Sequence, residues 1–258
     1  MSEPLRITSR DNPLLQRLRR LARDGAAYRR LGQVWLEGDH LCGALRARGG
    51  AAAQAVVSEE AWHDPALRAL AGWAERVAVV PAALFAGISA LESPARIGFV
   101  IEAPVPAAID AAAASVVLDR LQDAGNVGSI LRSAAAFGAR QVLALKGTAA
   151  LWSPKVLRAG MGAHFGLHLA EGLDEDALAA LRVPLVATGS HGGRALPDAE
   201  LPWPCAWVLG HEGQGVADTL RARCALQVRI PQPGGEESLN VAAAAAVCLY
   251  ESARRRLQ

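Results

Sequence analysis

The sequence predicts an α/β protein whose second half is a parallel sheet flanked by helices. Short apolar runs alternate with helical stretches over residues 115–258, a pattern typical of strands that are buried on both faces of a parallel sheet. Residues 104–114 contain two prolines and little periodicity, so they form the expected linker. Residues 1–103 would then be a separate small α/β domain, and the 258-residue length is enough for both.

The first domain is expected to begin with a helix over residues 5–31. The run 9–13 (SRDNP) offers an N-cap followed by proline at an early helical position. Leu14, Leu18 and Leu21 then recur at helical spacing. Helical stretches separate the strands expected after this helix, which are residues 34–36, 55–57, 77–80 and 98–101.

The second domain, residues 115–258, alternates more clearly between the two kinds of element. Strands are expected at 115–119, 141–146, 184–188, 205–209 and 226–230. Helices are expected at 126–137, from Ser153-Pro154 onward, and at 240–256. Ligands of such sheets bind at the carboxyl ends of the strands, so the loops that follow the strands are the place to look for function.

Charge is distributed unevenly along the chain. The net charge is only +2, but residues 1–48 hold ten arginines against five acidic residues and no lysine. Arginine forms forked hydrogen bonds to phosphate and stacks on bases, which favours RNA contact by this segment. A solvated basic face remains the alternative interpretation.

Several other classes of protein and site are disfavoured. No apolar run is long enough to cross a membrane, and the first residues lack the apolar core of a secretory signal, so we expect a cytoplasmic protein with no membrane partner. The four cysteines are scattered, which indicates reduced thiols. His164 and His168 are spaced as a helical pair but lack an acidic or cysteine partner, so no metal is expected.

Three polar, glycine-bearing segments each follow an expected strand: 118–138, 208–216 and 230–241. They place polar side chains beside apolar strand ends, where unpaired polar groups are costly. Each segment alone could be a tight turn or a helix cap. Together they predict one site, with the polar residues Asn126, Arg132, Glu212, Ser238 and Asn240.

Common cofactor folds do not match these segments. A dinucleotide fingerprint needs GxGxxG and a later acidic residue, whereas the first turn has only Gly125-Asn126-Val127-Gly128 and the next strand ends in Lys146. No phosphate-binding GxxxxGK[ST] and no GxSxG nucleophile turn occurs.

The three segments resemble the signature motifs of the SpoU (TrmH-type) RNA 2′-O-ribose methyltransferases of the SPOUT superfamily. The match covers residues 115–258, and residues 153–163 resemble the stretch between the first two motifs. Residues 7–13 and 35–38 are similar to a substrate-binding domain with a ribosomal-protein-like fold. The chain departs from the pattern at Ala124, where proline is usual, and at Ala242, where a small hydroxyl residue is frequent.

The resemblance implies a trefoil knot made from about Leu185 onward, and a homodimer formed through the last helix. It also implies S-adenosylmethionine (AdoMet) as methyl donor, held mainly by backbone groups, which glycines suit because the chain must approach closely. The N-terminal domain would bind RNA. The implied cofactor-binding residues are Thr188, Gly189, Leu209, Gly210, Glu212, Gly213, Ile230, Pro231, Ser238 and Leu239. The implied RNA-binding residues are Arg10, Arg17, Arg20 and Arg132.

The implied reaction moves a methyl group to a ribose 2′-hydroxyl, without a metal. Arg132 would either accept the hydroxyl proton or clamp an RNA phosphate. The first role would require a perturbed guanidinium helped by an RNA phosphate, because guanidinium normally stays protonated. Asn126 would orient Arg132 or the ribose, while Glu212, Ser238 and Asn240 would fix the loops and the substrate. Ribosomal RNA is the expected substrate, and transfer RNA is the alternative. A non-catalytic RNA-binding or ribosome-assembly protein and a nucleotide-dependent oxidoreductase are the rival functions.

Overall fold

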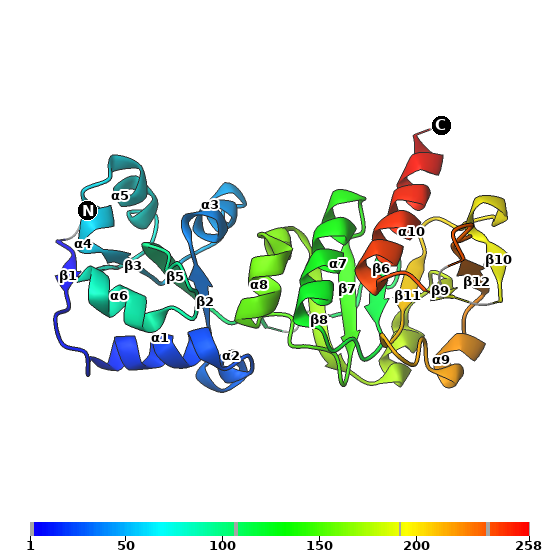
Figure 1. The fold of residues 1–258 in the computed structure, drawn as a ribbon, viewed down its shortest axis with the longest axis horizontal. Helices are drawn as coiled ribbons and strands as arrows, with labels where there is room; N and C mark the ends of the chain where they lie inside the picture. Colours follow the sequence, from blue (N-terminus) through cyan, green and yellow to red (C-terminus); the bar gives the residue numbers. More distant parts are fainter. Residues whose placement is uncertain (1–2, 106–107, 191, 236–237, 258) are drawn as a thin grey trace. The chain divides into compact units, whose positions relative to one another are not determined.

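The chain, as a computed structural model, folds into two compact units (Figure 1). The structure describes residues 3–105, 108–190, 192–235 and 238–257. One unit comprises Met1–Val105 together with Trp152–Phe165, and the other comprises Pro106–Leu151 with Gly166–Gln258. The division of the chain into domains at 1–103 and 115–258 remains a prediction, and residues 152–165 additionally pack with the first unit.

The first unit contains a five-stranded sheet in the order β1-β4-β3-β5-β2. Strand β5 runs antiparallel to β2 and β3, whereas β4 is parallel to β1 and β3. The sheet is therefore mixed. Its strands are β1 (Leu5–Arg6), β2 (Gln33–Glu37), β3 (Gln54–Ser58), β4 (Val77–Val80) and β5 (Ile97–Glu102).

Short helices accompany this sheet. They are α1 (Pro13–Arg23), α2 (Ala27–Leu31), α3 (Asp39–Ala47), α4 (Glu59–Trp62), α5 (Pro65–Ala71), α6 (Ala82–Ile88) and α8 (Pro154–Gly160). Helix α8 contacts both α1 and β2. The side chain of Asp64 caps α5 by accepting hydrogen bonds from two backbone amides, and Ser153 caps α8 in the same manner through one.

The prediction of one helix over residues 5–31 was wrong. Leu5–Arg6 is a strand, and the helical region divides into α1 and α2 because the chain is extended at Asp24. Asn12 caps α1, with Pro13 at its first position. The buried face of α1 is formed by Leu15, Leu18, Leu21 and Ala22, whereas Leu14 is only partly buried.

The second unit contains a seven-stranded sheet in the order β10-β12-β9-β11-β6-β7-β8, and every strand pair in it is parallel within the described residues. This confirms the predicted parallel sheet. Its strands are β6 (Ser115–Leu118), β7 (Gln141–Leu145), β8 (His168–Leu173), β9 (Leu185–Gly189), β10 (Arg194–Ala195), β11 (Ala206–Leu209) and β12 (Leu226–Arg229). Two edge strands, β8 and β10, were not predicted.

The helices of the second unit are α7 (Ala124–Ala136), α9 (Asp218–Ala222) and α10 (Val241–Arg256), and 3-10 turns occur at Glu175–Ala180 and Leu196–Asp198. A further 3-10 turn, Ala163–Gly166, begins in the first unit. Helices α7 and α10 lie side by side (Figure 1). The C-terminal end of α7 meets the middle of α10 through Phe137 and Tyr250, whose ring centroids are 5.8 Å apart. Trp207 of β11 is buried and donates to Ser252 of α10, which ties the sheet to that helix.

Membrane-spanning helices and clusters of metal ligands were both disfavoured by the sequence, and the described residues can be searched for each. There, no helix is long and apolar enough to cross a membrane. Within the same ranges, no three His, Cys, Asp or Glu side chains gather as metal ligands. The four cysteines are free, and burial raises the pKa of both Cys205 and Cys248 to about 12.

Candidate functional site

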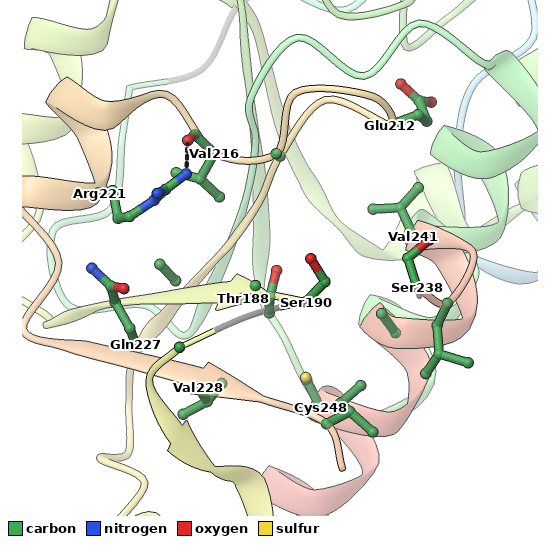
Figure 2. Close-up of a pocket in the computed structure, with 18 of the residues that line it drawn as sticks. Thr188, Ser190, Glu212, Val216, Arg221, Gln227, Val228, Ser238, Val241 and Cys248 are labelled. Carbon is green, nitrogen blue, oxygen red and sulfur yellow. Dashed lines mark hydrogen bonds between the residues drawn. The ribbon is translucent and has the colours of Figure 1, made fainter. Parts of the chain in front are cut away.

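A cavity of about 450 Å³ opens at the carboxyl ends of the second unit's parallel strands (Figure 2). Its walls come from the ends of β9 and β12, the loop after β11, and the first turns of α10. Figure 2 shows Arg221 and Gln227 on one side of this space and Ser238 and Val241 on the other. The second and third sequence motifs thus meet at one place.

Most of the residues expected to hold the cofactor line this cavity. They are Thr188, Gly189, Gly210, Glu212, Gly213, Ile230, Ser238 and Leu239. Leu209 and Pro231 are not among the lining residues. Leu209 is buried within β11, and Pro231 is exposed. Glu236 and Glu237 of the third motif lie outside the described residues.

Gly210 is required by the close approach of two backbone segments. A Cβ atom at this position would lie 2.1 Å from the carbonyl carbon of Gly215 and 2.1 Å from the amide nitrogen of Val216. The loop returns on itself through a hydrogen bond from the Gly215 amide to the His211 carbonyl, 2.8 Å long. Gly215 itself has a left-handed φ of +69°. Any side chain at 210 would push this loop out of place.

Glu212 connects this loop to the start of α7. Its carboxylate accepts hydrogen bonds from the backbone amides of Gln122 at 3.3 Å and Asp123 at 3.2 Å. Partial burial raises the pKa of Glu212, but the hydrogen bonds from its own amide and from Asp123 and Gln122 outweigh this, so the pKa lies below its usual 4.5. The carboxylate is therefore held in its charged form as an acceptor.

Asn126 and Asn240 extend this connection to the third motif. The Asn126 amide donates to Glu212 at 3.4 Å, and the Asn240 amide donates to the Asn126 side-chain oxygen at 2.9 Å. Asn240 also caps α10 by accepting from the amides of Ala242 and Ala243. One chain of hydrogen bonds through Glu212, Asn126 and Asn240 therefore links all three motifs.

Ser238 and Arg132 are placed differently from these three. Ser238 is exposed and lines the cavity. Arg132 lies on the solvent-facing side of α7, outside the cavity lining, and no described residue pairs with its guanidinium. Arg10, Arg17 and Arg20 belong to the first unit. Arg20 is exposed, whereas the Nε atom of Arg17 is buried without a partner among the described residues.

Sequence reasoning missed a second connection, on the other side of the 210–217 loop. Asp119, only 2% exposed, accepts from Nε of Arg120 at 2.7 Å and from the Ala217 amide at 2.8 Å. Arg120 also donates to Gln214 at 2.9 Å, and it has a left-handed φ of +59°. A charged residue directly after a buried strand was the available signal for Asp119.

Several lining residues were also missed, namely Ser190, Arg221, Gln227 and Gln232. Arg221 points one guanidinium nitrogen at the Val216 carbonyl, 2.7 Å away, and so supports the same loop (Figure 2). The side-chain oxygen of Gln232 is buried and has no hydrogen-bond partner in the described ranges. An unpaired buried acceptor in a cavity wall fits a ligand that carries amino groups.

Comparison with known protein families gives one match, over residues 113–250, to the SpoU rRNA Methylase family. This range contains all three motifs, α7 and most of α10.

Individual relatives agree with this match. The chain is 30% identical over 198 residues to a 23S rRNA (uridine(2479)-2′-O)-methyltransferase of Streptomyces viridochromogenes, covering 71% of this chain and 68% of that protein. It is 37% identical over 154 residues to the 23S rRNA (guanosine-2′-O-)-methyltransferase RlmB of Bordetella pertussis, covering 57% of this chain and 62% of RlmB. Among solved structures, the SpoU methyltransferase AviRb of Streptomyces viridochromogenes with AdoMet aligns at a TM-score of 0.85, with 25% identity over 96% of this chain and 99% of AviRb.

Proposed function

The chain belongs to the SpoU rRNA methylase family, and we propose that it transfers a methyl group from AdoMet to a ribose 2′-hydroxyl of ribosomal RNA. The observation that carries the proposal is the cavity of about 450 Å³ where the second and third motifs meet. Relatives named as 23S rRNA 2′-O-methyltransferases favour ribosomal RNA over transfer RNA.

The cavity's chemistry fits AdoMet. Val228, Leu239 and Val241 provide apolar wall for an adenine ring, and the unpaired oxygen of Gln232 can accept from an amino group. Exposed backbone at Gly189 and Gly213 allows close approach of a polar ligand. When bound, AdoMet supplies an electrophilic methyl group on a sulfonium.

The chain's own residues then position the acceptor. We propose that Glu212, Asn126 and Asn240 hold the three motif loops in register, with Ser238 contributing a hydroxyl at the cavity wall. Arg132 lies on the same helix as Asn126, is exposed, and has no partner among the described residues, which suits a group that meets RNA.

Arg132 can aid the reaction in two ways. A guanidinium holds its proton at accessible pH, so a role as base needs help from an RNA phosphate. A clamp on that phosphate would instead place the 2′-hydroxyl in line with the methyl group. We favour the clamp because no neighbouring group in the described ranges pairs with Arg132.

The proposal also includes a homodimer and an RNA-binding first domain. Val247 and Tyr250, two apolar side chains of α10 that are 41% and 53% exposed, support the proposal of a homodimer through this helix. The first domain is proposed to have a ribosomal-protein-like fold and to bind RNA through Arg10, Arg17 and Arg20. The trefoil knot from about Leu185 onward, the ranges of the two domains and the cytoplasmic location also stay predictions.

The test combines binding and transfer. Calorimetry should show one AdoMet site per chain, and ribose-methylation mapping of ribosomal RNA, from cells with and without the gene, should reveal one mark that depends on the gene. AdoMet binding with every ribosomal mark unchanged would direct the search to transfer RNA. No AdoMet binding would support the non-catalytic RNA-binding alternative.

A further inference from the structure

A second hollow, of about 390 Å³, lies in the first unit and belongs wholly to its N-terminal helices. Helix α1 supplies one side and α2 with the connecting turn supplies the other. The lining residues are Arg19, Arg20, Arg23, Asp24, Ala27, Arg30 and Leu31. Arg10 and Arg17, which the sequence associates with RNA, are not among them.

The hollow carries a surplus of positive charge. Four guanidinium groups line it and only one carboxylate, that of Asp24, which is paired with Arg30. Arg19 and Arg23 are four residues apart on α1, and like charges at this spacing destabilise a helix. Helix α1 has no acidic residue to offset them. An anion in the hollow would relieve this repulsion.

Two of these arginines are held in place by the protein itself. One guanidinium nitrogen of Arg19 donates to the Arg10 carbonyl at 2.9 Å, and one of Arg23 donates to the Gly87 carbonyl at 3.3 Å. Each guanidinium has five N–H donors, so most of them stay available. Arg20, between them in sequence, is exposed and has no partner in the described ranges. Holding two of the groups in advance reduces the entropy that binding costs.

The remaining wall is apolar. Ala27 is buried and Leu31 is half-buried, so one side of the hollow can accept a sugar or a base edge while the arginines face phosphate. Arg19, Arg20 and Arg23 follow one another along a single helix, which suits successive phosphates of a strand better than one small anion.

We propose that this hollow is a binding site for the phosphate backbone of the RNA substrate, an inference that rests on the function proposed above. It assigns Arg19, Arg23 and Arg30 to RNA binding alongside Arg20. These groups contribute affinity and register, and they take no part in methyl transfer.

The test compares full-length variants with equal charge loss. The double variant Arg20→Ala/Arg30→Ala removes two guanidiniums from the hollow. Arg48→Ala/Arg76→Ala removes two exposed ones from elsewhere in the same unit. Filter binding with total ribosomal RNA over a range of salt is the measurement. A single variant, Arg20→Glu, alters a side chain with no partner in the described ranges and so guards against misfolding of the double variant.

We expect the hollow variants to bind ribosomal RNA roughly tenfold to a hundredfold more weakly, with a salt slope lower by about 1 for each phosphate that is no longer neutralised. The control variant should stay within a few-fold of the unaltered protein. If both double variants weakened RNA binding equally, the proposed site would be contradicted. Displacement of RNA by inorganic phosphate at micromolar concentration would also contradict it, since the hollow would then bind a free anion. AdoMet calorimetry on the same proteins reports separately on the proposed methyl transfer.

Discussion

Two parts of helix α7 differ in how far their polar side chains are hydrogen-bonded within the protein. At the start of α7, Asn126 is bound on both sides, to Glu212 of one loop and Asn240 of another. Two turns later, Arg132 is exposed and has no partner in the described ranges. The Asn126 side chain has its hydrogen bonds satisfied by the protein, whereas the Arg132 guanidinium is available for the RNA contact proposed above. Changes in the first should therefore alter loop order and cofactor binding, whereas changes in the second should alter only the reaction with RNA.

The largest effect is expected at Arg132. Arg132→Ala should lower the single-turnover rate on ribosomal RNA by about a hundredfold or more, because a misplaced hydroxyl loses the alignment that methyl transfer needs. AdoMet affinity and the thermal midpoint should stay unchanged. Arg140→Ala, an exposed arginine after the same helix, is the matched control. Arg132→Lys keeps the charge without the fork, so recovery of most of the rate would contradict a forked clamp.

Gly210→Ala should have the second-largest effect, because it should distort the 210–217 loop. The added methyl group meets loop backbone at 2.1 Å, so we expect a loss of about 1–3 kcal/mol in stability and much weaker AdoMet binding. Gly43→Ala is the control, because an added Cβ at this position, far along the sequence from the cavity lining, meets no atom within 4 Å. Thermal melting and calorimetry measure both. Equal behaviour of the two variants would show that the tight return of this loop is not required.

Asp119→Asn probes the connection that the sequence did not reveal. All partners of the Asp119 carboxylate in the described ranges are donors, so the new amide nitrogen must face one of them. We expect a loss of about 1.5–3 kcal/mol in the free energy of unfolding, since hydrogen bonds to a charged group are removed. Asp218→Asn, whose side chain is 94% exposed, should cost little. A denaturant titration in which both variants lose the same stability would argue against the Asp119 connection.

Glu212→Gln should have the smallest effect, about 0.5–1.5 kcal/mol in AdoMet binding, because the new side chain keeps one acceptor oxygen for the backbone amides of Gln122 and Asp123 before α7. The pKa of Glu212 is lowered in the folded protein, so its contribution to stability is present above about pH 4.5 and is lost as pH falls through the folded pKa. The variant should therefore lose less stability than the unaltered protein on acidification below pH 4.5. An unchanged acid profile in melting experiments would show that Glu212 does not clamp the loops.

The sequence predicted the central strands well because each is a continuous apolar run, as in Val116-Val117-Leu118. Strand β8 was missed since residues 168–173 mix half-buried polar and glycine residues, and β10 because a two-residue edge strand has no pattern. The break after α1 depends on the backbone at Asp24, which apolar spacing does not report.

The candidate site was predictable where it depended on glycine spacing and on polar residues after strands, as for Gly210 and Glu212. It was not predictable where distant side chains meet. Arg120 has a left-handed backbone that sequence patterns associate with glycine, and its pairing with Gln214 spans 94 positions. Contacts of that kind become visible only in three dimensions.

The discontinuous make-up of the first unit has a consequence for how the protein is made. Its residues 1–105 leave the ribosome early, but Trp152–Phe165, which contacts α1 and β2 through α8, follows only after β6, α7 and β7 have been synthesised. The N-terminal unit therefore cannot reach its final packing while it is the only part of the chain available. The first unit can complete its packing only once residue 165 has emerged, so a nascent chain stalled near residue 150 would present chaperones with an unfinished surface.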